Sequence, residues 1–325
     1  MSTSTVRLLS PYSIQAGQSW LRGNLHTHSE YSDGLLSVRK LKELYKGAGY
    51  HFLAITDHDS IGAWHGQPFV LDLTEPPNDI HEPPKFVAFP GYESDRQGIS
   101  VNCIGARPGL DGVHKPLDDL QGCITQVNAE GGFALLNHPH FMGLHDAGSV
   151  LALDGLLGVE IANTKCVFAT GMIAAGLATD LWDAVLSQGA RLWGFATDDY
   201  HADDISPAFT GWVMARATAA TPEAILASLK AGNFYASTGI TIRDISVAGA
   251  TISIKTENAY GIRFVGKNGR VLREANGPNA AYTATGSEDY VRIECWNGSP
   301  VFSDNPRLRF FAQMAWSQPI FVARE

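Results

Sequence analysis

The sequence predicts an α/β fold in which a mostly parallel sheet, open or closed into a barrel, is followed by an antiparallel β region. From about residue 20 to about residue 240, short apolar runs alternate with helical patterns, which is typical of a parallel sheet covered by helices. From residue 241 onward, apolar and polar residues alternate and no strong helical signal is present. We therefore expect a lead-in over 1–20, an α/β unit over 21–240 and a β domain over 241–325.

Four segments have the spacing of apolar residues that predicts helices. In the first, apolar residues recur at helical intervals and Gly49 follows as a stop signal. The last begins with Thr221 as a candidate N-cap and Pro222 at the first helical position. The predicted helices span 37–50, 116–132, 169–190 and 221–232.

Apolar runs between these helices predict the strands of the sheet. In the β domain, the segment "KNGR" (267–270) predicts a hairpin turn. The predicted strands before residue 240 span 21–27, 51–56, 85–93, 99–106, 133–138, 156–163 and 191–199.

Composition excludes several classes of protein. The chain has 325 residues and a formal charge of −9, which argues against general binding to nucleic acid or anionic membranes, since both require a basic surface. No apolar run of about 20 residues predicts a membrane helix, and the N-terminus lacks the pattern of a secretion signal. None of the four cysteines lies in a CxxC pair, so we expect a cytoplasmic protein without a disulfide framework.

Histidines and carboxylates stand at or just after the ends of five predicted strands. In α/β barrels the C-terminal strand ends meet on one face, so these residues should converge on one pocket. His26 and His28 are two residues apart, as are Asp199 and His201, and this spacing places both side chains of a pair on the same side of a strand. The full set is "HTH" (26–28), "TDHD" (56–59), Glu93, His138, and "DDYH" (198–201).

Mixed imidazole and carboxylate ligands suit Zn, Mn or Fe more than Ca or Mg. Taken singly, each motif has a simpler explanation: Asp57 could cap a turn, Glu93 could be a satisfied buried acid, and His138 could be a loop residue. Five such motifs in order at five strand ends make coincidence improbable. The sequence therefore predicts a metal site.

The motifs "HTHSEYSDG", "TDHD", "GYE", "NHP" and "DYH", in this order, resemble those of the polymerase and histidinol phosphatase (PHP) family over about residues 20–240. The resemblance implies a distorted seven-stranded β/α barrel, TIM-like in form, that binds two or three divalent metal ions. Three further segments, "WLRGNLHTHSEYSDG", "LKAGNFYASTG" (229–239) and "MAWSQPIFV" (314–322), resemble the carbaryl hydrolase-like branch, some members of which cleave carbamate esters.

The resemblance also implies a role for each residue. The first metal would be held by His26, His28, Glu93 and Asp199. Glu93 would bridge to a second metal, which His138 would also bind. A further metal would be held by Asp33, His58 and His201, which are also the candidate catalytic residues.

The sequence departs from the family pattern at one position. Relatives commonly have "GHVNxxG" after the bridging glutamate, and that histidine helps to bind the second metal. Here the segment reads "GISVNCIG", so Ser100 stands where the histidine is expected, and a serine hydroxyl is a poor ligand. His140 either compensates for this loss or is an ordinary loop histidine, and the sequence leaves both alternatives open.

The predicted mechanism follows from the metals, which lower the pKa of a bound water to about 7 in the best cases, so that it can attack phosphorus or a carbonyl carbon. No Gly-rich phosphate loop or GxSxG motif is present. Lys165 and Arg96 are candidates for binding substrate phosphate, or are solvated surface charges; Asn163 either binds substrate or caps a turn.

Three functions remain open from the sequence. The first is a metal-dependent phosphoesterase acting on a small phosphorylated molecule, which Lys165 and Arg96 favour. The second is a metal-dependent hydrolase of a carbamate, ester or amide, which the loss of a histidine at Ser100 slightly favours. The third is a non-catalytic module, which is disfavoured because nearly every expected ligand is present.

Overall fold

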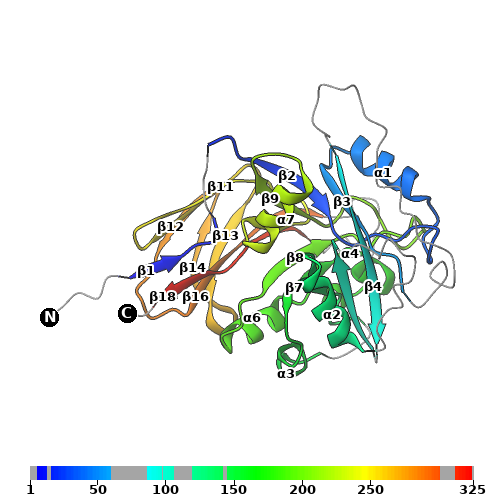
Figure 1. The fold of residues 1–325 in the computed structure, drawn as a ribbon. Coiled ribbons are helices and arrows are strands. Elements are labelled where there is room, and N and C mark those ends of the chain that lie inside the picture. The colour runs from blue at the N-terminus through cyan, green and yellow to red at the C-terminus, as the bar shows by residue number, and fades with distance from the viewer. Residues whose placement is uncertain are drawn as a thin grey trace.

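The structure is a computed structural model in which strands predominate and helices lie on one half of the molecule (Figure 1). In the described part of the chain, no helix combines the length and the apolar character needed to cross a membrane. The structure describes residues 6–12, 16–59, 86–96, 98–105, 119–141, 145–300 and 312–323.

Seven strands of the α/β region lie side by side in chain order. The first three pair in parallel, as do the last three, in agreement with the predicted alternation of strands and helices. β5 is antiparallel to both of its neighbours, because the chain returns directly from β4 through a tight turn at Gly98 (φ +80°). These strands are β2 (Ser19–Asn24), β3 (Phe52–Ile55), β4 (Val87–Arg96), β5 (Ile99–Ile104), β6 (Phe133–Leu136), β7 (Leu156–Asn163) and β8 (Trp193–Thr197).

Two strands that the sequence did not predict, β9 (Trp212–Ala217) and β10 (Phe234–Ser237), extend this sheet: β9 pairs antiparallel to β2, and β10 pairs antiparallel to β9. The sheet is curled, as one buried apolar cluster shows: it combines side chains from strands that lie far apart in the strand order, including Phe52, Phe195 and Phe234. β8 lies against β9 and β10, but among the described residues no strand pairing joins them. The structure therefore confirms a mixed α/β fold and does not show a barrel closed by hydrogen bonds.

The predicted helices at 37–50 and 221–232 are confirmed, with Ser37 and Thr221 as N-caps. The predicted helix at 116–132 begins at Leu120, where Asp119 caps it, and residues 116–118 lie outside the described ones. The helices are α1 (Val38–Gly47), α2 (Leu120–Ala129), α3 (Ala147–Leu151), α4 (Thr164–Thr170), α5 (Ile173–Gly176), α6 (Thr179–Ser187) and α7 (Pro222–Lys230).

The single long helix predicted over 169–190 is wrong. Gly171 ends α4 in the left-handed conformation, with φ +68°. α5 then ends at Gly176, whose backbone approaches Asn163 so closely that an added Cβ would lie 2.2 Å from the Asn163 carbonyl oxygen. Leu177 forms an isolated bridge with Ala162 of β7, and α6 begins afterwards. Close contact with the sheet thus interrupts a segment whose apolar spacing is otherwise helical.

The region after residue 240 is antiparallel, as predicted, and the "KNGR" segment joins β13 to β14 as a hairpin through a short 3-10 turn. β1 (Arg7–Leu9), from the lead-in, pairs with β18. The strands of this region are β11 (Ile242–Ala248), β12 (Thr251–Thr256), β13 (Gly261–Gly266), β14 (Arg270–Asn276), β15 (Asn279–Thr283), β16 (Tyr290–Pro300), β17 (Ala312–Ser317) and β18 (Ile320–Ala323).

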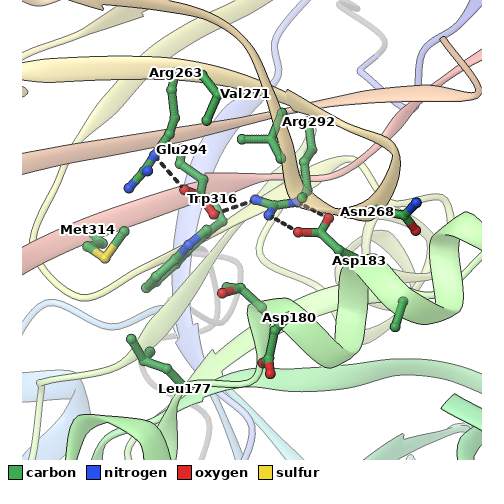
Figure 2. Close-up of a pocket in the computed structure, with 14 residues that line it drawn as sticks. Leu177, Asp180, Asp183, Arg263, Asn268, Val271, Arg292, Glu294, Met314 and Trp316 are labelled. Carbon is green, nitrogen blue, oxygen red and sulfur yellow. Dashed lines mark hydrogen bonds and ion pairs between the residues drawn. The ribbon is translucent and has the colours of Figure 1, made fainter. Parts of the chain in front are cut away.

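The two regions share a sheet and a buried ion-pair cluster. β17 pairs with β10, so the large sheet continues past residue 240. Arg292 of β16 reaches Asp183 of α6 through two contacts of 2.8 and 2.6 Å, and also contacts Glu294 at 2.6 Å (Figure 2). These residues border a cavity of about 580 Å³ between α6 and the β strands. The division of the chain at residue 240 stays a prediction.

Candidate metal centre

The predicted site residues converge at the C-terminal ends of the strands. His26 and His28 follow β2, His58 follows β3, and Glu93 lies within β4. Single parallel bridges extend the pairing beyond the strands, from Thr27 to Tyr200 and from His58 to Glu93, and hold these loops in register. The complete set of eight predicted ligands is brought together: His26, His28, Asp33, His58, Glu93, His138, Asp199 and His201.

The innermost group consists of His26, His28, Glu93 and Asp199, all almost completely buried. The Nε2 atoms of the two histidines lie 3.1 Å apart. Each of them lies 3.3 Å from Glu93 Oε2 and 3.4 Å from Asp199 Oδ1. These are the four residues that the family resemblance assigned to the first metal.

The second oxygen of Glu93 faces another histidine. Glu93 Oε1 lies 3.1 Å from His138 Nε2 and accepts a hydrogen bond of 2.7 Å from Asn137 Nδ2. Glu93 therefore stands between two groups of ligand atoms, in the position expected of a bridging carboxylate.

The third group lies nearer the solvent. Asp33 Oδ2 is 3.2 Å from His201 Nε2 and 3.6 Å from His58 Nε2, while Asp33 Oδ1 is 3.4 Å from His28 Nδ1. The Asp33 side chain is 40% exposed, whereas the innermost group is buried. The centre is thus open on the side of Asp33.

The hydrogen bonding of His26 shows that the innermost group fits a cation. His26 Nδ1 lies 2.8 Å from Glu160 Oε1, so we assign the ring hydrogen to Nδ1. His26 Nε2 then presents a lone pair toward His28 Nε2 and two carboxylate oxygens. Such an arrangement needs a cation or protons at its centre, and imidazole nitrogens with carboxylate oxygens are ligands for divalent transition metals.

The electrostatics of the metal-free site point the same way. Burial opposes the charged form of Glu93 and Asp199, yet the nearby His26 holds the pKa of both carboxyls well below their usual range. Burial also opposes protonation of His26, but Asp199, Glu160 and Glu93 together raise its pKa well above the ordinary value. These shifts all favour positive charge at the centre of this group.

Two aspartates beside the ligands stabilise the loops rather than face the centre. Asp57 accepts hydrogen bonds from the Ser29 amide and from the hydroxyls of Ser29 and Ser32, which fixes the segment between His28 and Asp33. The carboxylate of Asp198 accepts from three consecutive backbone amides, those of residues 209–211. Within the "TDHD" motif, Asp57 is therefore a structural turn residue, whereas His58 faces the centre.

The three predicted substrate-binding residues differ in their surroundings. Lys165 Nζ lies 2.9 Å from His201 Nε2 and 3.6 Å from Asp199 Oδ1, directly beside the centre. Asn163 caps α4 and donates to Glu160 and Asp199, so it is a cap as well as a neighbour of the centre. Arg96 forms a two-pronged ion pair with Asp59, at 3.0 and 2.9 Å.

Ser100 and His140 are placed away from the ligand groups. Ser100 donates a hydrogen bond to Asp95 on the neighbouring strand. His140 Nε2 contacts Asp180 of α6 at 3.0 Å, and it belongs to none of the groups of potential ligands found among the described residues. The structure thus supports the interpretation of His140 as a loop histidine.

Sequence reasoning missed two acidic residues near the centre. Glu160 lies fully buried in β7 and contacts His26, Thr197 and Asn163. The sequence signal for Glu160 is its place inside the apolar run "LLGVEIAN" (156–163), where a buried carboxylate requires a partner. Asp95, two residues after Glu93 on β4, lies 2.8 Å from His58 Nδ1. Its signal was the same two-residue spacing that marked His26 and His28.

Comparisons with known proteins bear on the fold. No family model matches the chain. Over 45 residues it is 47% identical to the DNA polymerase/3'-5' exonuclease PolX of Bacillus subtilis, but the match covers 14% of this chain and only 8% of that protein. The structure resembles that of a Bacteroides vulgatus two-domain protein containing a predicted PHP-like metal-dependent phosphoesterase, with a TM-score of 0.52 and 15% identity over 98% of both chains. A Bifidobacterium adolescentis structure overlaps 55% of this chain and 87% of its own, with 15% identity and a TM-score of 0.35, too low to support an argument.

The similarity to the Bacteroides protein confirms, at the level of the fold, the resemblance to PHP-like proteins that the motifs indicated. It extends through the C-terminal strands, because it covers nearly the whole of both chains. The more specific resemblance to the carbaryl hydrolase-like branch is not confirmed.

Proposed function

We propose that this chain is a metal-dependent phosphoesterase that hydrolyses a small phosphorylated substrate. The observation that carries the proposal is the convergence of eight imidazole and carboxylate side chains around Glu93, with a lysine beside them. The fold shared with a predicted PHP-like phosphoesterase is consistent with it. We propose two or three divalent ions, Zn, Mn or Fe, held by the eight residues in the sets that the family resemblance implies.

Bound divalent ions would lower the pKa of a water molecule and neutralise charge on substrate oxygens. The residues of the chain prepare the site for this chemistry. His201 Nδ1 lies 2.9 Å from the Asp199 carbonyl oxygen, so we assign its hydrogen there and leave Nε2 as an acceptor beside Lys165. The Lys165 ammonium is then placed to attract phosphate oxygens entering from the open side near Asp33.

We also propose the finer architecture that the family resemblance implies. The curled sheet of residues 21–240 would be the distorted seven-stranded barrel, and 241–325 would be a separate β domain after the lead-in of residues 1–20. The buried cluster that joins both ends of the curled sheet supports a barrel-like interior. The acidic charge of −9 favours a small-molecule substrate over a nucleic acid.

The alternative function is hydrolysis of a carbamate, ester or amide. The observation in its favour is the replacement of a metal-ligating histidine by Ser100, which faces Asp95 rather than the Glu93–His138 pair. A site with fewer second-metal ligands gives less charge neutralisation to a phosphate, whereas a carbonyl substrate needs less.

Elemental analysis of protein purified without added metal, combined with assays on p-nitrophenyl phosphate, bis-p-nitrophenyl phosphate and an aryl carbamate, tests the proposal. Two or three metal equivalents with phosphate-ester cleavage are expected. Metal with carbamate cleavage alone would favour the alternative. Less than one equivalent, and no activity after Mn²⁺ or Zn²⁺ is restored, would contradict both functions.

A substitution of Lys165 distinguishes phosphate-ester hydrolysis from carbamate hydrolysis. Lys165→Met removes the cation beside His201, so phosphate-ester cleavage should fall while any carbamate cleavage remains. Lys255→Met on β12 is the matched control, since it removes the same charge from an exposed position outside the strands that carry the site. Equal phosphatase rates for Lys165→Met and the control would remove Lys165 from the proposed site.

A further inference from the structure

Asp95 is an acidic residue of the centre to which the family resemblance gives no role. It lies two residues after Glu93 on β4, so both side chains project from the same face of the strand. Its cross-strand partner on β5 is Ser100, the residue that replaces the expected histidine. The position of the lost ligand and the position of Asp95 are therefore directly opposite each other.

The two carboxylate oxygens of Asp95 contact different residues. Oδ1 accepts the hydrogen bond from the Ser100 hydroxyl. Oδ2 lies 2.8 Å from His58 Nδ1, which in turn lies 3.2 Å from Glu93 Oε2. Ser100 thus fixes the orientation of the carboxylate whose second oxygen faces the centre.

The geometry at His58 distinguishes a shared ion from a simple hydrogen bond. His58 Nδ1 is buried and, among the described residues, makes no hydrogen bond of acceptable angle, although two carboxylate oxygens lie within 3.2 Å. A carboxylate that merely oriented the ring would align with its N–H group. Ligand atoms of His58, Glu93 and Asp95 all lie within 4.8 Å of one another, which suits three ligands around one cation.

We propose that Asp95, with Glu93 and His58 Nδ1, holds a divalent cation and supplies the ligand that Ser100 cannot. This inference rests on the proposed metal-dependent function. A neutral imidazole has one acceptor nitrogen, so His58 keeps its hydrogen on Nε2, which faces Asp33 Oδ2 at 3.6 Å. This refines the set implied by the family resemblance: His58 binds through Nδ1 at the Asp95 site, and the Asp33 group keeps Asp33 and His201. Two carboxylates and one imidazole form an oxygen-rich site, which favours Mn²⁺ over Zn²⁺.

Metal content and a spectroscopic signature test the assignment. Asp95→Asn, reconstituted with Mn²⁺ and freed of excess metal, should hold about one equivalent less than the wild type. Asp95→Cys loaded with Co²⁺ should gain a thiolate-to-cobalt charge-transfer band, because a thiolate at this position would bind the ion directly. Asp180→Asn and Asp180→Cys, at an exposed carboxylate that contacts His140 and belongs to none of the potential ligand groups among the described residues, are the matched controls.

Unchanged metal content in Asp95→Asn, together with no new band in Asp95→Cys, would overturn the assignment and leave Asp95 as an orienting partner of His58. Circular dichroism of each variant in chelator shows whether it folds like the wild type. Failure of the proposed function is separate: it would appear as wild-type protein that binds metal but cleaves no phosphate ester. The metal count of the Asp95 variants would still decide this inference.

Discussion

The protein contains two buried clusters of charged side chains that differ in how their charges are balanced. In the cluster between α6 and β16, Arg292 contacts Asp183 twice and Glu294 once, and Tyr290 also donates to Asp183. In the candidate metal centre, the Nε2 atoms of His26 and His28 lie 3.1 Å apart and within 3.4 Å of carboxylate oxygens of Glu93 and Asp199. The first cluster is satisfied by its own residues, and the second is not.

Burial of charge is therefore not by itself a sign of function. A buried charge that has lost its partner is costly, so a cluster fixed for structure supplies both signs within hydrogen-bonding distance. A cluster built for a ligand leaves one sign to be supplied from outside. The matched cluster at Arg292 joins two regions of the fold, whereas the unmatched cluster at Glu93 is ready for a cation.

The largest expected effect is the loss of a partner in the matched cluster. Asp183→Ala leaves Arg292 buried with only Glu294, and should lower the free energy of unfolding by about 3–5 kcal/mol. Chemical denaturation measures this value. Metal content and activity per folded molecule should stay unchanged, because Asp183 belongs to none of the potential ligand groups.

Asp180→Ala is the control for this change, on the same helix. Its side chain is 78% exposed, so its pair with His140 should contribute at most about 1 kcal/mol. Equal destabilisation by the two substitutions would contradict the distinction between the clusters.

Removal of the proposed bridging carboxylate should act mainly on activity. Glu93→Gln lowers the charge offered to the metals, and we expect kcat/KM for the phosphate ester to fall on the order of 10²–10³-fold, or about 3–4 kcal/mol. The metal-free variant should also be less stable than the metal-free wild type at neutral pH, because His26 holds the pKa of Glu93 well below its usual range and this stabilisation is lost with the charge. Full activity in Glu93→Gln would show that the ions lie elsewhere.

A smaller effect is expected at Glu160, which contacts His26 without being a proposed ligand. Glu160→Gln weakens the orientation of the imidazole, and metal affinity should fall by about 10–100-fold. Competition with a chromogenic chelator measures the affinity. The number of bound ions at saturation should not change, and a lower number would make Glu160 a ligand itself.

The smallest effect is a pH dependence that only the metal centre should show. Because the pKa of His26 is raised in the metal-free fold, its proton contributes stability below the ordinary value of about 6.5, and this is lost as the pH rises through the folded pKa. Metal requires the neutral ring, so the rise in Tm caused by Mn²⁺ should grow as the pH increases from about 6.5 toward that raised pKa. The loss of unfolding free energy caused by Asp183→Ala should not change with pH over this range. Burial opposes the charge of Arg292, but the neighbouring carboxylates keep its pKa raised, so it stays charged. A Tm rise independent of pH would contradict the assigned proton.

The centre was largely predictable because its ligands stand at strand ends, where short apolar runs stop and the next polar residue faces the pocket. His26, His138 and Asp199 follow this rule, whereas Glu93 lies within β4. Glu160 and Asp95 did not fit it, since one lies inside an apolar strand and the other beyond a ligand already identified. Spacing places Asp95 on the same face of the strand as Glu93, but the contacts of Asp95 with His58 and of Glu160 with His26 join residues distant in the sequence.

The fold was predictable where local patterns decide it, and not where neighbouring elements do. Thr221 begins a helix as its capping side chain predicts. The segment 169–190 has helical spacing, but contact of Gly176 with β7 divides it. β9 and β10 went unpredicted, and the pairing of β10 with β17 depends on residues about 80 positions apart.

This pairing of β10 with β17 has a consequence for attempts to shorten the protein. A chain ending at residue 240 would leave β10 as an edge strand, with its backbone amides and carbonyls open to another molecule. It would also remove Trp316, which is fully buried against apolar residues of the α/β region. Such a fragment would carry all eight proposed ligands and yet be prone to aggregation through that edge.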